Sequence, residues 1–222
     1  MKKLTVGGSF IGWESIKRLV KAAENHRDKL LILCLFKLGG RTSEVLSLEA
    51  KQFDFRASKY SIIVRDMLVL KKYIRLKNAK GKFTGKTQSV PRYRTFPVLK
   101  DESFSEELDR IKNMKGLLFH YPFKKNKPIS RQLSLHYVKA VGFRAGFIIN
   151  DHYLRGQRVA QLKSEYGFRG EPLNEWIGWS ARPEKGMEMQ THYGSLGWEG
   201  LEIELLEGKM RRKQVYEMVK QS

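Results

Sequence analysis

The feature that most constrains this chain is a stretch, residues 27–38, that is apolar on nearly every side. A helix of that kind has to be covered all round, so the stretch predicts a buried helix, ended by Gly39 and Gly40. The chain has 222 residues, of which 41% are apolar. That is enough for one substantial core, so we expect one globular unit.

The same stretch also limits the class of protein. Its longest apolar run, residues 30–36, falls far short of the roughly 20 residues that span a bilayer, and no signal peptide precedes it. Cys34, inside that run, is the only cysteine. A disulfide framework and a thiolate zinc cluster within one chain are therefore excluded. We expect a soluble, cytoplasmic protein without a membrane partner.

Further helices are predicted where apolar residues recur at helical spacing. They cover residues 13–24, 41–48, 103–116, 130–141, 151–166 and 172–177, with Ser103 and Asp151 as expected N-terminal caps. Residues 59–98 differ, because β-branched and apolar runs flank a segment rich in turn formers. This indicates a small antiparallel sheet with a long tip. The expected fold class is α+β, mainly helical with a small antiparallel β-sheet.

The charge balance points to a polyanionic partner. The chain carries 43 Lys and Arg against 23 Asp and Glu, a formal net charge of +20. Such a field gathers nucleic acid. Residues 71–100 are the most basic part and contain no Asp or Glu. We therefore expect double-stranded DNA to bind this segment, through Lys77, Lys80, Lys82, Lys86, Arg92 and Arg94.

Two short motifs each place an arginine near a helix start. In GGRTSEVLSL, Arg41 follows two glycines, and Glu44 could orient its guanidinium. In DHYLRG, His152 and Arg155 are three residues apart and share one helix face. Arginine suits a phosphodiester because its planar fork donates two N–H bonds to phosphate oxygens at once. Either motif alone is weak evidence, since a solvated His and Arg at a helix start are common.

Four segments in order resemble the tyrosine recombinase, or phage integrase, family. GGRTSEVLSL resembles its first arginine box, HYLRG its H-x-x-R box, IGWS its third box and THYG its tyrosine segment, over residues 27–193. The resemblance implies that Tyr193 attacks a DNA phosphodiester to form a 3′-phosphotyrosyl bond. Arg41 and Arg155 would stabilise the charge and His152 would accept or position a proton. No metal, ATP or other cofactor is implied.

The chain departs from the family pattern in two places. The third box usually has His where this chain has Trp179, whose indole N–H can donate to phosphate but cannot shuttle a proton. The gap from Trp179 to Tyr193 is also longer than usual. The family's general-acid lysine lies at the turn of its sheet, and the spacing from Arg41 favours Lys71 or Lys72.

The resemblance also implies an organisation and an assembly. Residues 1–198 are expected to form the catalytic domain and residues 199–222 a helical tail that docks on a neighbouring protomer, with no N-terminal core-binding domain in this chain. We expect self-association on DNA as a dimer or tetramer, and integration or excision of an archaeal or viral mobile element. The alternatives are a type IB topoisomerase and a DNA-binding protein with little or no activity.

Overall fold

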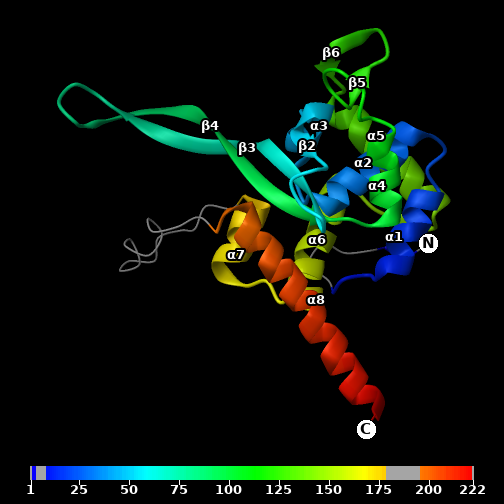
Figure 1. The fold of residues 1–222 in the computed structure, drawn as a ribbon. Helices are drawn as coiled ribbons and strands as arrows, with labels where there is room; N and C mark the ends of the chain where they lie inside the picture. The colour runs from blue at the N-terminus through cyan, green and yellow to red at the C-terminus, as the bar shows by residue number, and fades with distance from the viewer. Residues whose placement is uncertain (1, 4–8, 179–195, 222) are drawn as a thin grey trace.

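The computed structural model describes residues 2–3, 9–178 and 196–221. In chain order the elements are β1 (Lys2–Lys3), α1 (Trp13–Lys21), α2 (His26–Lys37), α3 (Thr42–Leu46), η1 (Ala50–Gln52), β2 (Phe53–Asp54), β3 (Ser61–Lys77), β4 (Phe83–Leu99), α4 (Glu102–Asp109), β5 (His120–Tyr121), β6 (Lys124–Pro128), α5 (Arg131–Arg144), β7 (Phe147–Ile148), α6 (Asp151–Glu165), α7 (Gly170–Ile177) and α8 (Gly197–Gln221). Helices form most of the body, and one long hairpin leaves it (Figure 1).

The buried helix predicted at residues 27–38 is α2, and it lies at the centre of the core. Its residues from Leu30 to Lys37 are all buried, and α1, α3, α4, α5 and α6 pack around it. The Asn25 side chain caps its start by accepting a hydrogen bond from the Asp28 N–H. The helix ends at a turn in which Gly39 has φ +57°, a conformation that favours glycine.

The predicted small antiparallel sheet with a long tip is present, and most of the tip is itself paired strand. Strands β2, β3 and β4 pair antiparallel in that order, and β3 and β4 stay paired almost to a turn at Asn78–Lys82. The bases of β3 and β4 pack on the core through Val64, Phe96 and Val98. The outer part projects from the body as a ribbon (Figure 1). Backbone pairing between the two strands continues along this ribbon, as far as Lys77 and Phe83.

Two predicted helix caps were wrong by one or two residues. Helix α4 is capped by Asp101, which accepts from the Phe104 N–H, and not by Ser103. Helix α6 is capped by Asn150, which accepts from the Tyr153 N–H, and not by Asp151. Both true caps are Asx residues in extended conformation, as N-caps usually are. The carboxylate of Asp151 is thereby free to contact other elements.

Helix α8 begins on the body and ends away from it. Its Leu201 and Leu205 are fully buried, and the helix packs against β4, α6 and α7. Beyond these residues it extends outward to the C-terminus (Figure 1). The mainly helical α+β prediction is confirmed. Among the described residues, no helix combines the length and apolar character needed to cross a membrane.

Candidate active site

The turn after α2 fixes the first arginine of the site. The Glu44 carboxylate accepts a hydrogen bond from the Arg41 backbone N–H at 2.8 Å and another from Arg41 Nη1 at 2.7 Å. Glu44 is completely buried, whereas the Arg41 side chain is 43% exposed. The contact expected between these two residues is thus present. It orients the guanidinium while leaving part of it open to a ligand.

The second motif lies at the start of α6, and Asp151 ties that start to α5. The buried Asp151 carboxylate accepts a hydrogen bond from the Ser134 hydroxyl at 3.0 Å, and its Oδ1 has no hydrogen-bond partner among the described residues. Burial raises the pKa of Asp151, while the side chains of Thr42 and Ser134 oppose that shift. Because Thr42 directly follows Arg41, its effect on Asp151 places the starts of α3 and α6 near each other. His152, the next residue, is exposed there.

Arg155 joins three separate segments beneath this surface. Its Nη1 donates to the Gly39 carbonyl, and its Nη2 donates to the Ile177 carbonyl at 3.3 Å. Nη1 also lies 3.9 Å from Glu44 Oε2, and the side chain is only 7% exposed. Burial lowers the pKa of Arg155 to about 10, while Glu44 opposes the shift. The residue therefore remains a cation at neutral pH, fixed in position.

The structure thus brings Arg41 and Arg155 together around one carboxylate. Arg41 comes from the turn after α2 and Arg155 from α6, more than a hundred residues later, and both contact Glu44. Two guanidiniums on one buried carboxylate leave an excess positive charge. Arg41 presents this charge to solvent, and Arg155 supports it from within. Such a pair can bind a phosphate oxygen through charge-assisted hydrogen bonds.

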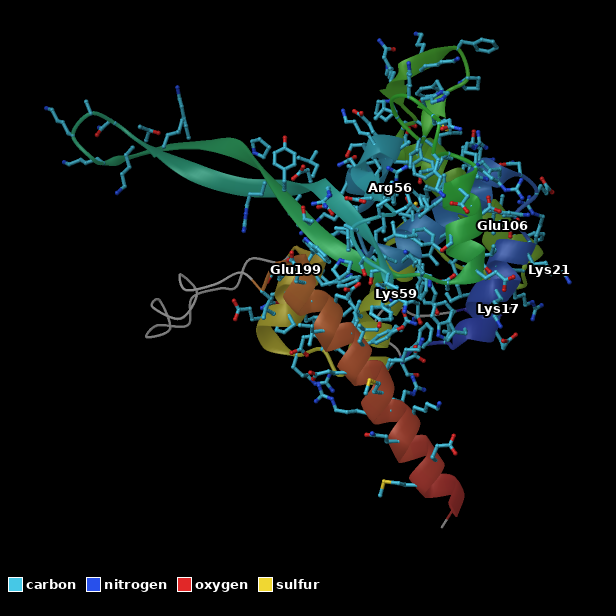
Figure 2. All side chains as sticks on the ribbon, in the orientation of Figure 1. Lys17, Lys21, Arg56, Lys59, Glu106 and Glu199 are labelled. Atoms are coloured by element: carbon cyan, nitrogen blue, oxygen red, sulfur yellow. The ribbon has the colours of Figure 1, made fainter. Side chains whose placement is uncertain are left out.

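The basic residues predicted on the sheet fall into two groups. Those exposed on the hairpin are Lys77, Lys80, Lys82, Lys86 and Arg92, whereas Arg94 is buried. Figure 2 shows side chains projecting from the far end of the hairpin, remote from Lys17 and Lys21 on the opposite side of the body. The exposed group therefore forms a basic extension separate from the arginine pair.

The candidate general acids lie elsewhere than expected. Lys71 and Lys72 are in the middle of β3, not at the turn of the hairpin, which comes at Asn78–Lys82. The pairing of β3 with β4 shifts register between Val69 and Lys72. The side chains of Lys71 and Lys72 lie outside the described part of the structure, so their role stays a prediction.

Trp179 and Tyr193 also lie outside the described residues. The chain on either side of them meets α7, however. Gly178, with φ +72°, ends α7, and its N–H donates to the Glu175 carbonyl. The Leu196 N–H donates to Glu175 Oε2 at 3.1 Å. Both ends of the segment that contains the two predicted residues are thus held at the helix whose Ile177 carbonyl contacts Arg155.

The sequence did not predict the contacts that two residues of the site make. Asp151 was predicted as a helix cap, yet its carboxylate accepts a hydrogen bond from Ser134 of α5. Arg94 was grouped with the hairpin cations, yet its Nη2 donates to the Leu38 carbonyl at 3.3 Å. The alternation of polar and apolar residues in a strand could have indicated that Arg94 shares the face of the buried Phe96.

Solved structures of similar shape identify the fold. No protein-family model matches the chain. The integrase of mycobacterium phage Brujita superposes with a TM-score of 0.55 at 18% identity, covering 92% of this chain and 60% of the integrase. The chain has the fold of a tyrosine recombinase catalytic domain. The XerH site-specific recombinase, in a complex with its difH substrate, superposes with a TM-score of 0.53 at 18% identity over 81% of this chain and 48% of XerH.

A sequence comparison adds a distant relative of this chain. Transposase A of transposon Tn554 from Staphylococcus aureus is 26% identical over 152 residues, which make up 68% of this chain. The matched region is 40% of that transposase. This chain therefore spans less than half the length of the curated relatives that it matches.

Proposed function

We propose that this chain is a site-specific DNA recombinase that cleaves and rejoins DNA through a 3′-phosphotyrosyl intermediate. The observation that carries the proposal is the sharing of buried Glu44 by Arg41 and Arg155, with part of Arg41 open to solvent. This arrangement suits a phosphodiester whose charge increases in the transition state. The fold, the distant transposase relative and the order of the sequence motifs support the same reading.

Each residue has a defined part in the proposed reaction. The Tyr193 hydroxyl loses its proton and attacks phosphorus, so that an O–P bond to tyrosine forms and the bond to the 5′ oxygen breaks. Arg41 and Arg155 donate to the non-bridging oxygens, and Arg155 is already held by the Gly39 and Ile177 carbonyls. Fixed donors of this kind stabilise a transition state without reorganising. His152, at the exposed start of α6, accepts or positions a proton.

Lys71 or Lys72 protonates the leaving 5′ oxygen in this proposal, and Trp179 donates its indole N–H to the phosphate. The 5′-hydroxyl of another strand then attacks the phosphotyrosyl bond and restores a phosphodiester. Each step exchanges one phosphate ester for another, so the bond energy is conserved. The reaction suits the integration, excision or transposition of a mobile element.

Duplex DNA is the proposed partner, and the exposed hairpin is its proposed second contact. The lysines of the hairpin can neutralise backbone phosphates at a distance from the reacting bond. Assembly of two or four protomers on DNA would bring two duplexes together for exchange. In that assembly the outer part of α8 is the proposed contact with a neighbouring protomer.

A pool of nicked duplexes, random in sequence around the nick, tests the reaction without knowledge of the target. Cleavage beside the nick releases a short fragment that diffuses away, so the covalent complex is trapped. We expect the full chain to give an adduct that survives denaturation and to enrich one sequence in the pool. Tyr193→Phe should give none, whereas Tyr60→Phe, at an exposed tyrosine, should keep the yield.

The other outcomes separate the alternatives. Adducts without enrichment, together with relaxation of any supercoiled plasmid, would point to a topoisomerase of type IB. Binding of the duplexes without any covalent adduct would indicate a DNA-binding protein without cleavage activity and would overturn the proposal.

A further inference from the structure

Arg94 is a buried cation with unused hydrogen-bonding capacity. Only 8% of the residue is exposed, and its guanidinium lies 4.4 Å from the centre of the Phe96 ring. Nη2 donates to the Leu38 carbonyl at 3.3 Å and to Met67 Sδ at 3.5 Å. Within the part of the chain that the structure describes, Nε and Nη1 are buried without any hydrogen-bond partner. Native structures contain few such groups.

The position of Arg94 places it directly behind the arginine pair. Arg94 donates a hydrogen bond to the Leu38 carbonyl, and Arg155 donates one to the next carbonyl in the chain, that of Gly39. A methyl group added to Gly178 would lie 3.3 Å from Arg94 Cδ, so the end of α7 covers the side chain closely. Arg94 therefore contacts two of the segments that Arg155 joins, the turn before Arg41 and the end of α7.

The charges around this turn do not balance. Burial lowers the pKa of Arg94 to about 9, the Glu44 carboxylate opposes this shift, and the charges of Arg155 and Arg41 add to it. Arg94 and Arg155 both remain cations at neutral pH. Glu44 is the carboxylate that acts on both of them and also pairs with Arg41, so positive charge is in excess around this turn. A buried charge is costly unless it is paired, and an anion bound at Arg41 would reduce that cost.

We propose that Arg94 is a third guanidinium of the phosphate site, a positioning residue that strengthens the binding of the reacting phosphodiester by Arg41 through its charge and through the turn that presents Arg41. The inference rests on the proposed function, because it takes the scissile phosphate as the ligand. Arg94 does not reach the phosphate itself. It raises the positive potential at Arg41 and holds the Leu38 carbonyl, so that the cation is in place before DNA binds.

The test removes one charge from the protein and one from the DNA. The DNA is the sequence recovered from the random pool, made either with its scissile phosphodiester or with an uncharged methylphosphonate at that position. The protein is the full chain with Tyr193→Phe, so that binding is measured without cleavage. Arg94→Met, Arg94→Lys and Arg92→Met are added in turn. Arg92 is the matched control, an exposed arginine two residues away on the same strand.

The readout is the ratio of the two affinities, which a purely structural role would not change. Without a further substitution we expect the phosphodiester to bind about tenfold more tightly than the methylphosphonate. Arg94→Met should reduce this ratio to about threefold or less, and Arg94→Lys should largely restore it. Arg92→Met should weaken both duplexes equally and leave the ratio unchanged.

An unchanged ratio in Arg94→Met would overturn the inference and leave the proposed function intact. A ratio near one before Arg94 is substituted, or no adduct in the random pool, would instead refute the proposed function. Arg94→Met leaves Glu44 paired with Arg41 and Arg155, so no buried carboxylate loses its only partner and folding is not expected to limit the test. Circular dichroism of each variant checks this.

Discussion

At the scale of single residues, the candidate site depends on the charge of Glu44. This fully buried carboxylate contacts Arg41 and Arg155 and acts on Arg94. Glu44→Gln keeps the shape of the side chain but leaves buried cations uncompensated. We expect it to lower the free energy of unfolding by about 3 kcal/mol, measured by denaturant titration.

The matched control for Glu44 is Glu14, whose exposed carboxylate pairs with Lys17 at 2.9 Å. Glu14→Gln should change the free energy of unfolding by less than about 1 kcal/mol, because exposed ion pairs contribute little. Equal effects of the two substitutions would contradict the role assigned to Glu44.

The sequence predicted some of these residues and misplaced others for a physical reason. The contact of Glu44 with Arg41 follows from their spacing at a helix start. Arg92 and Arg94 lie on the same face of β4, yet Arg92 is exposed and Arg94 is buried. Arg94 is covered by Phe96 and by the end of α7. The alternation of residues along a strand does not show which positions on one face other elements cover. Trp179 and Tyr193 remain predictions from their motifs.

At the scale of elements, the hairpin of β3 and β4 is predicted to make the salt-dependent contacts with DNA. Each phosphate contact that is lost reduces the slope of log affinity against log salt by about 0.9. The double variant Lys80→Gln, Lys82→Gln should therefore reduce the slope by about 2. Lys17→Gln, Lys21→Gln, on the opposite side of the body, should leave it nearly unchanged (Figure 2). Equal slopes of log affinity against log salt for both double variants would show that the hairpin does not contact DNA.

The packing of α8 on the body gives a second prediction at this scale. Alanine normally stabilises a helix relative to glycine by about 1 kcal/mol. At Gly208, however, a methyl group would overlap the Tyr166 carbonyl at the end of α6. We expect Gly208→Ala to lower the unfolding free energy by about 2 kcal/mol, with a reduced thermal midpoint as the measurement. Glu207→Ala, at the exposed neighbour, is the control, and stabilisation by Gly208→Ala would contradict the packing described.

Helical elements were predicted better than the sheet. The stretch that forms α2 is apolar on nearly every side and must therefore be buried, and the glycines after it end the helix. Residues 71–93 contain turn formers and few apolar side chains, so their composition favours a loop. Their pairing in β3 and β4 comes from backbone hydrogen bonds between distant residues, which composition does not report.

At the scale of the whole molecule, a helical body holds an arginine site, and a basic ribbon and a C-terminal helix leave that body in different directions (Figure 1). The buried α2 makes this possible, because the turn at its end and the helices packed around it supply Arg41, Arg155 and their supports. The body is therefore expected to position the reacting phosphate while the projections engage more distant groups.

The central claim is that a phosphate held by this site is attacked by one tyrosine. It is tested most directly by mass spectrometry of the covalent complex, after nuclease trimming of the DNA and proteolysis of the chain. The account predicts a nucleotide attached through its 3′-phosphate to the peptide that contains Tyr193. Attachment to a different tyrosine, or through a 5′-phosphate, would contradict it.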